Sequence, residues 1–463
     1  MPGLSLIDGE VCLEALPARK VYRIPGEAAK AGLVSVFILA WFFLHSWRGL
    51  LVYFSNDDIM NMYWARETPL WRLLLSVLVP FTTVYRPTGA LLYRCLYTLF
   101  GLEPLPFRIA FYALLLTNLF LLYKATCAIT GRRAVGAIAA FVASFHSRFS
   151  DLYLNNGTIY DVLCGSFYLG TFYYYISMRG RGRSLRLSQL LALYLLAVAA
   201  LNSKEMAATL PIVLLLYELF RPSRHILSSA IPLSLLSMVM AIGTWARFRD
   251  ASRLMHNDLY AMHLDLGLYN TAVYLNDLLC LKFGSLNEFA AAAIIAALFG
   301  IAVLARSRLL LFWALFILIT PLPVLFIPHR SLYAFYIPVF GWAAFLATLL
   351  SRVPLPLSVT LTVAVLLVRH VPIPWAEAMP AHSKLYALHQ GLMATTPSLP
   401  PRSRVLFLND AFQGEAWTPL MFVRLTYNDL DLKLLRSKSV TEQDRLAATA
   451  VFDYVPGHMI RLK

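Results

Sequence analysis

Long apolar blocks separated by short charged segments are the feature that most constrains this chain. Each block holds 15–24 residues, and a helix of about 20 apolar residues is long enough to cross a bilayer. Charged residues make up 14% of the chain, whereas soluble domains carry about 25%. We therefore predict an all-α polytopic membrane protein with spans at 31–54, 107–129, 134–148, 158–178, 187–202, 206–220, 226–245, 289–305, 309–327, 332–350 and 355–371.

Basic residues lie between these blocks and indicate the orientation. Cytoplasmic loops are enriched in Lys and Arg, so we place every basic cluster on the cytoplasmic side. The chain must then cross the membrane an even number of times between one basic cluster and the next. Eleven spans meet this condition, with the N-terminus inside and the C-terminus outside. Two further stretches, 87–101 and about 267–284, are predicted to lie in or dip into the outer face, which gives about 11–13 transmembrane helices. The net charge of +15 is thus a topology signal, and no nucleic-acid partner is predicted.

The same pattern divides the chain into three parts. Residues 1–30 are predicted to form a cytoplasmic tail, and 31–371 a transmembrane domain with an outer-face loop at 55–106. Residues 372–463 lack apolar spans and are enough for a small extracytoplasmic α/β domain, with a strand at 404–408. The five cysteines show neither metal-ligand spacing nor a disulfide framework.

Asp57 and Asp58 directly follow the first apolar block. A carboxylate there can take a proton from an acceptor hydroxyl, or hold a divalent cation such as Mg²⁺ or Mn²⁺. The sequence Asn-Asp-Asp also fits an ordinary turn or a helix N-cap. Because two adjacent side chains do not readily share one task, we expect one catalytic and one positioning acid, and favour Asp57 as the base.

Other ionisable residues collect on the same predicted face, where they are costly at membrane depth and usually mark function. Arg86 offers a fork of donors suited to phosphate, but it also fits a snorkelling interfacial arginine. Lys204 and Glu205 join two apolar runs. They form either a structural pair or, since adjacent residues on a helix point apart, contacts with two different partners.

Two further groups complete the candidate site. His146 and Asp151 lie on the second outer loop, and Asp161 lies a turn into a span, where a carboxylate is costly unless paired. Asp151 also fits a plain loop. Arg330, Tyr333 and Tyr336 are spaced i, i+3 and i+6, which indicates either an interfacial aromatic belt or a phosphate-binding arginine with tyrosines along a lipid-facing groove.

Taken in chain order, these residues resemble the membrane domain of GT-C glycosyltransferases. They are most similar to the O-mannosyltransferase family that in animals carries tetratricopeptide repeats. The matching features are Asp57-Asp58, Arg86-Pro87, His146 with Asp151 and Asp161, Ser203-Lys204-Glu205 before Pro211 and Tyr217-Glu218, and Arg330 with its tyrosines. The chain departs from that family in lacking the repeat array and in having Ser147 after His146.

The resemblance implies an inverting transfer of a sugar from a polyprenyl-phosphate donor to an acceptor, which is a protein, lipid or glycan. It implies Asp57 or Asp58 as the base, and Arg86, Lys204 and Arg330 as ligands of the donor phosphate. The expected lining residues are His146, Asp151, Asp161, Glu205, Tyr333 and Tyr336. The expected location is a bacterial inner membrane, with the site facing the periplasm.

Two other classes of function fit a polytopic membrane protein. A transporter or flippase of lipid or polysaccharide also carries intramembrane charges. However, the charges here gather at one face rather than at the midplane, and no inverted repeat is evident. A membrane scaffold is disfavoured by the cost of Asp161 and Lys204-Glu205.

Overall fold

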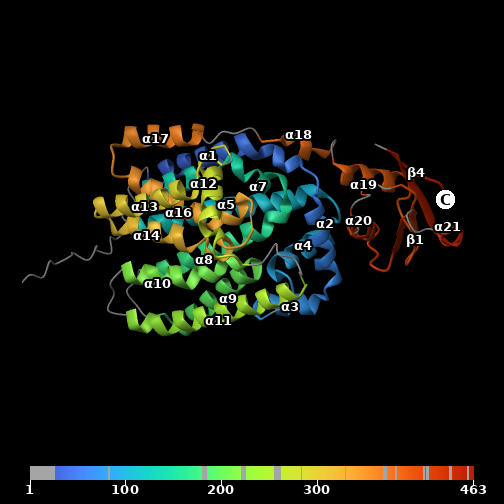
Figure 1. Cartoon of the computed structure of the whole chain (residues 1–463), viewed down its shortest axis with the longest axis horizontal. Coiled ribbons are helices and arrows are strands. Elements are labelled where there is room, and N and C mark those ends of the chain that lie inside the picture. Colours follow the sequence, from blue (N-terminus) through green and yellow to red (C-terminus); the bar gives the residue numbers. More distant parts are fainter. Residues whose placement is uncertain are drawn as a thin grey trace, which may run out of the picture.

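The computed structural model gives a mostly helical molecule with a small sheet at one end (Figure 1). It describes residues 27–81, 84–179, 185–220, 226–254, 262–282, 284–328, 330–368, 373–380, 383–409, 412, 415, 417–436, 441–455 and 458–463.

Every predicted apolar block contains a helix. Four segments are long and apolar enough to span a membrane, namely Gly32–Leu51, Pro104–Thr130, Arg308–Leu325 and Leu332–Leu350. The prediction of an all-α polytopic membrane protein is therefore confirmed, whereas the count of eleven spans and their sidedness stay predictions. The helices of these blocks are α1 (Glu27–Ser46), α5 (Pro104–Thr130), α6 (Arg133–Ser144), α8 (Ile159–Arg179), α9 (Leu187–Ser203), α10 (Leu210–Phe220), α11 (Ile226–Leu254), α13 (Glu288–Leu304), α14 (Arg308–Ile319), α15 (Leu322–Leu325), α16 (Tyr336–Leu350) and α17 (Leu355–Val368).

The segment 55–106, predicted as an outer-face loop with a helical stretch at 87–101, is helical over most of its length. It forms α2 (Asn56–Glu67), α3 (Leu70–Leu78) and α4 (Pro87–Phe100). Helix α3 buries Leu73 but exposes Trp71 and Leu75, as a helix lying at a membrane surface would. The second stretch predicted to lie at the outer face contains α12 (Leu266–Leu278).

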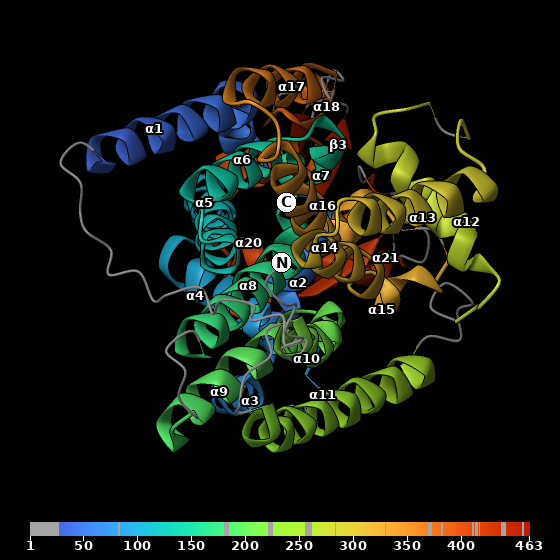
Figure 2. The ribbon, with the colours of Figure 1, turned by 90° about the vertical axis from the view of Figure 1, so that its left-hand side faces the viewer.

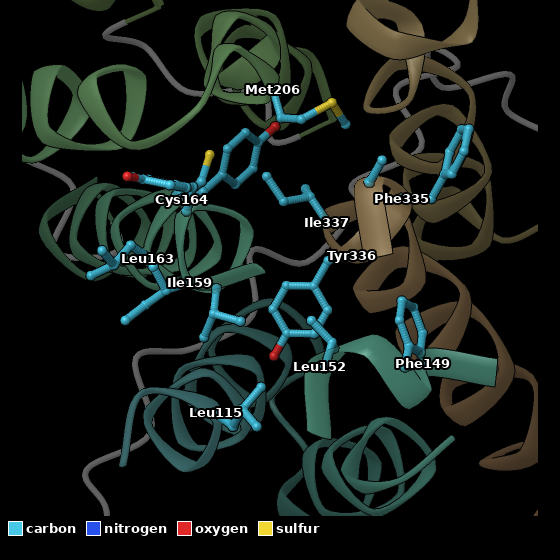
Figure 3. Packing of buried hydrophobic residues seen from close by; sticks show 14 of the residues in the cluster. Leu115, Phe149, Leu152, Ile159, Leu163, Cys164, Met206, Phe335, Tyr336 and Ile337 are labelled. Atoms are coloured by element: carbon cyan, nitrogen blue, oxygen red, sulfur yellow. The ribbon is translucent and has the colours of Figure 1, made fainter. Parts of the chain in front are cut away.

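Helices α5, α8 and α16 form the centre of the membrane domain. Their apolar side chains form one core, to which Leu115 of α5, Ile159 of α8 and Tyr336 of α16 belong (Figure 3). Glycines allow close approach: a Cβ at Gly341 would lie 2.6 Å from the Phe316 ring of α14. Small residues at helix contacts are typical of membrane proteins, because packing there replaces the hydrophobic effect.

Short 3₁₀ helices and one short α-helix shape the end of the bundle near α2. They are η1 (Trp47–Leu51), η2 (Ser147–Phe149), α7 (Ser150–Leu154), η3 (Asn156–Thr158), η4 (Glu205–Thr209) and η6 (Leu332–Phe335).

The C-terminal residues form the small α/β unit that the sequence predicts. Its sheet has the order β2-β1-β3-β4, with β1 parallel to β2 and β3, and β4 antiparallel to β3. The strands are β1 (Arg404–Phe407), β2 (Lys433–Arg436), β3 (Ala450–Val455) and β4 (His458–Arg461). The helices are α18 (Trp375–Ala378), α19 (Lys384–Thr395), α20 (Thr418–Thr426) and α21 (Glu442–Ala447).

This unit packs on α2 and α4, at the right-hand end of the membrane domain in Figure 1. Arg424 on α20 donates to the Tyr63 hydroxyl at 2.6 Å, and the Tyr97 hydroxyl donates to the Leu425 carbonyl at 2.6 Å. His389 Nδ1 lies 3.0 Å from the Tyr53 hydroxyl. The C-terminal unit is thus fixed to the helix that begins with Asn56-Asp57-Asp58.

Candidate active site

Helix α2 begins with a capping box that uses Asp58. The Ser55 hydroxyl accepts from the Asp58 amide at 3.3 Å, and Asp58 Oδ2 accepts from the Ser55 amide at 2.8 Å. The other carboxylate oxygen accepts from the Tyr93 hydroxyl at 2.7 Å. Burial raises the pKa of Asp58, and the nearby Arg108 guanidinium opposes this shift. The Asp58 carboxylate is therefore held in place by two donor groups and removed from solvent.

Arg108 is a structural residue that the sequence analysis missed. It is fully buried near the start of α5, and its guanidinium donates to the carbonyls of Val52, Tyr53, Tyr153 and Leu154. These bonds join the entry to α2 with α7, and the charge balances Asp58. The available signal was an arginine inside an otherwise apolar block, where an unpaired charge is costly.

Asp57, in contrast, is exposed. Its side chain lies against Gly157, where an added Cβ would be only 2.9 Å from the Asp57 Cβ. The Asn155 carboxamide oxygen fixes this contact by accepting from the Ser55 hydroxyl at 2.8 Å and from the Gly157 amide at 2.7 Å. Within the described part of the chain, the Asp57 carboxylate makes no hydrogen bond or ion pair.

Asp151, in the first turn of α7, shares this region with Asp57. Partial burial raises the pKa of Asp151, and the charge of Asp57 raises it further. Two residues that lie far apart in the sequence therefore place their carboxylates within electrostatic reach of each other.

A buried ion pair links the Lys204 ammonium with Asp161 Oδ1. Lys204 has extended backbone at the end of α9, which turns its side chain toward α8. Its Nζ also lies 5.4 Å from the ring centre of Tyr333, a distance that suits a cation–π contact. The predicted cost of Asp161 in a span is thus met by pairing.

The second ion pair joins Arg86 Nη2 and Glu205 Oε2 at 3.2 Å, with side chains 17% and 23% exposed. Arg86 lies in the left-handed region, with φ 43°, and such strain in a residue other than glycine is usually held by surrounding contacts. Here the guanidinium lies 4.7 Å from the ring centre of Tyr85 and 5.4 Å from that of Tyr160. Its Nε is buried without a hydrogen-bond partner among the described residues.

Arg86, Asp161, Lys204 and Glu205 form what we call the four-charge cluster. Lys204 and Glu205 contact different partners, as predicted from their adjacency. The Tyr333 hydroxyl interacts electrostatically with Asp161, Asp151 and Asp57. This tyrosine therefore lies between the four-charge cluster and the carboxylates of Asp57 and Asp151.

His146 is buried and held by backbone groups. It is 2% exposed, its Nε2 lies 2.9 Å from the Leu278 carbonyl oxygen, and its Nδ1 accepts from the Arg148 amide at 3.2 Å. Both ring nitrogens are therefore engaged by backbone, which anchors η2 to α12. Its predicted role in lining the substrate site stays a prediction.

The segment expected to begin a continuous α-helix at Arg330 starts instead with a 3₁₀ helix over residues 332–335, and Tyr336 is the first residue of α16. Tyr336 lies in the apolar core (Figure 3), where its hydroxyl accepts from Asn118 Nδ2 at 3.3 Å, and its role in lining the site stays a prediction. Arg330 is half-buried before η6, and its role stays a prediction. Its neighbour His329 lies outside the described residues.

A second buried charge pair lies at the other end of α8. Arg179 donates to the Glu218 carboxylate at 2.6 Å through Nε and at 2.9 Å through Nη2. Glu218 Oε1 also accepts from the Tyr175 hydroxyl at 2.7 Å. Both charged side chains are at most 3% exposed.

The sequence allows for a divalent cation held by carboxylates. In the described ranges, no group of three or more His, Cys, Asp or Glu side chains is arranged to hold a metal ion. Dependence on Mg²⁺ or Mn²⁺ stays a prediction.

Comparison with known proteins agrees with the fold. The family model for dolichyl-phosphate-mannose-protein mannosyltransferases matches residues 83–245, a segment that includes the whole four-charge cluster. No match to the curated proteins was found. The family match supports a membrane glycosyltransferase of GT-C type. Over about a third of its length the chain is similar to the dolichyl-phosphate-mannose-protein mannosyltransferases, and the resemblance to GT-C enzymes is confirmed.

Proposed function

We propose that this chain is an inverting glycosyltransferase that moves a sugar from a polyprenyl-phosphate donor to an acceptor at the extracytoplasmic face. The observation that carries the proposal is the exposed Asp57 carboxylate beside the four-charge cluster, inside a chain whose residues 83–245 match a mannosyltransferase family. The donor type follows from that family's description, and the face of action follows from the charge pattern of the loops.

In the proposed reaction, Asp57 takes the proton of the acceptor hydroxyl while the oxygen of that hydroxyl attacks the anomeric carbon of the sugar. The bond from that carbon to the phosphate oxygen breaks, and its electron pair leaves with polyprenyl phosphate. A base in the right place contributes about 10²–10⁴-fold. Asp57 suits this task because it is exposed and otherwise unbonded in the described chain. Asp58 suits a positioning role, since its oxygens are already engaged.

The departing phosphate needs cations. Arg86 presents a buried Nε without a partner in the described chain and is held by two aromatic rings, so its guanidinium has a free donor for a phosphate oxygen. Lys204 adds a second positive charge, with Asp161 and Glu205 holding the two cations in position. Arg330 is the third proposed phosphate ligand. Preorganised charges of this kind stabilise a leaving group without reorganising during the reaction.

The remaining residues are assigned by position. Asp151 and Tyr333 are proposed to line the sugar and acceptor side, because both interact electrostatically with Asp57. The C-terminal unit is proposed to form an extracytoplasmic wall for the acceptor. Asn56, the neighbour of Asp57, donates to both Glu415 carboxylate oxygens at 3.0 Å, so this unit lies next to the proposed base.

The test uses purified protein in proteoliposomes, with polyprenyl-phosphate mannose labelled in the sugar as the probe. We expect the protein to retain the labelled lipid, as read by mass spectrometry, and to release label from it with inversion at the anomeric carbon. Release with retained configuration, or the absence of both retention and release, would contradict the proposal. Movement of intact donor between leaflets without sugar release would identify a flippase instead.

A further inference from the structure

A lipid-facing cavity lies at the opposite end of the bundle from Asp57. This cavity of about 700 Å³ opens between the first part of α1 and helices α5 and α6. This volume is within the range of about 300–1,000 Å³ typical of ligand sites. Its walls are mostly apolar and include Gly32, Ile38, Leu116, Phe120, Arg133 and Ala137.

The cavity exists because only the second half of α1 packs on the bundle. Phe37 and Trp41 contact Phe141 of α6, with ring centres 5.0 and 5.7 Å apart. Before them, Leu33 and Val36 are 70% and 63% exposed. Figure 2 shows the N-terminal end of α1 projecting from the bundle beside α5 and α6. In a bilayer, hydrocarbon must fill such a space, because the apolar walls offer water no partners.

One end of this cavity is basic. Arg133, the first residue of α6, lines it directly, and Arg132 precedes it. Lys124 lies one turn beyond Phe120, with its Nζ 5.6 Å from the centre of that lining ring. None of the residues that line the cavity is acidic. Basic pockets between transmembrane helices suit the phosphate of an anionic lipid headgroup.

We infer that this groove binds one anionic phospholipid, whose acyl chain fills the space between α1 and α5 while its phosphate pairs with Arg133. The site is separate from the proposed donor site. Arg108, which touches the entry to α2, and Thr130, at the Arg133 end, are 22 residues apart on α5, or about 33 Å along the helix axis. A phosphate bound at Arg86 therefore lies too far from Arg133 to contact it.

The experiment counts lipids retained on the purified full chain by native mass spectrometry, after exchange into vesicles of phosphatidylglycerol or of phosphatidylcholine. We expect one phosphatidylglycerol to stay bound under conditions that remove phosphatidylcholine. Ala137→Trp fills the groove and Arg133→Gln removes the cation, and each should lower this retention at least about tenfold, a free-energy change of about 1.4 kcal/mol.

Two control variants match these changes. Arg308→Gln removes another exposed arginine at the first position of an apolar helix, and Leu191→Trp enlarges an exposed residue on α9. Both should retain lipid as the wild type does. If Ala137→Trp unfolds early, Arg133→Gln alone decides. Equal retention of the two phospholipids, or wild-type retention in Arg133→Gln, would overturn the inference, and neither result depends on sugar transfer.

Discussion

The two ends of helix α8 hold buried charges of different kinds. At one end, Arg179 and Glu218 satisfy each other with two hydrogen bonds and a third from Tyr175. At the other end, Asp161 pairs with Lys204 beside Arg86 and Glu205, which stay 17% and 23% exposed. Eighteen residues separate Asp161 from Arg179, about 27 Å along the helix.

We call the Arg179–Glu218 pair closed, because its charges are shielded from solvent, and the four-charge cluster open, because two of its side chains are partly exposed. A pair that is fully satisfied and shielded has no capacity left for a ligand, so its effect is on folding alone. The four-charge cluster keeps an unpartnered guanidinium nitrogen in the described chain and lies beside an exposed carboxylate. The same helix thus carries a structural end and a proposed catalytic end.

The largest expected effect is on the closed pair. Glu218→Gln leaves the buried Arg179 guanidinium without a counter-charge, and breaking a buried pair in this way costs about 3–5 kcal/mol. Thermal unfolding in detergent should show the loss, while turnover per folded molecule stays at the wild-type level. A selective loss of turnover in this variant would show that the two ends of α8 do not divide their roles in this way.

At the open cluster, the expected effect is on the reaction. Arg86→Gln removes a charge that faces the proposed leaving phosphate, and losing one preorganised donor costs about 10²–10³-fold in turnover. Arg86→Lys should recover part of the rate. The measurement is the initial rate of sugar release from labelled donor. A wild-type rate in Arg86→Gln would remove this residue from the phosphate site.

A smaller effect is expected from the support of Arg86. A Cβ at Gly89 would lie 2.2 Å from the Tyr160 ring, so Gly89→Ala must displace that ring at a cost of about 1–3 kcal/mol. Because Tyr160 contacts the Arg86 guanidinium, donor affinity should fall as well. Gly170→Ala is the matched control, since its nearest neighbour would be 3.9 Å away. Equal donor binding in the two variants would separate Tyr160 from Arg86.

The smallest effect concerns the docking of the C-terminal unit. Burial lowers the pKa of His389, and Glu103 opposes this shift. The neutral His389 ring therefore stabilises docking of the C-terminal unit at any pH above the ordinary pKa of histidine. This contribution is lost as the pH falls through the lowered pKa of His389, where the ring becomes charged. Hydrogen exchange in α19 should rise on acidification in the wild type but not in His389→Gln. The same rise in both would exclude His389 as its origin.

Features that depend on local patterns could be predicted from the sequence. Apolar blocks located the membrane helices, the strand near residue 404 was found, and the adjacency of Lys204 and Glu205 predicted separate partners. Contacts distant in sequence were less accessible. The burial of Asp58 depends on Tyr93, 35 residues away, and the core position of Tyr336 depends on its contact with Asn118, 218 residues away. Helices α2 and α3 were missed because they are short and flank polar residues.

The most direct test of the central claim is the rate of sugar release from labelled polyprenyl-phosphate mannose, per folded molecule, in Asp57→Asn. Glu288→Gln, which changes another exposed carboxylate in the first turn of a helix, is the control. The proposed mechanism predicts a rate about 10²–10⁴-fold below that of the wild type, with unchanged thermal unfolding and a normal rate in the control. A wild-type rate in Asp57→Asn would contradict it.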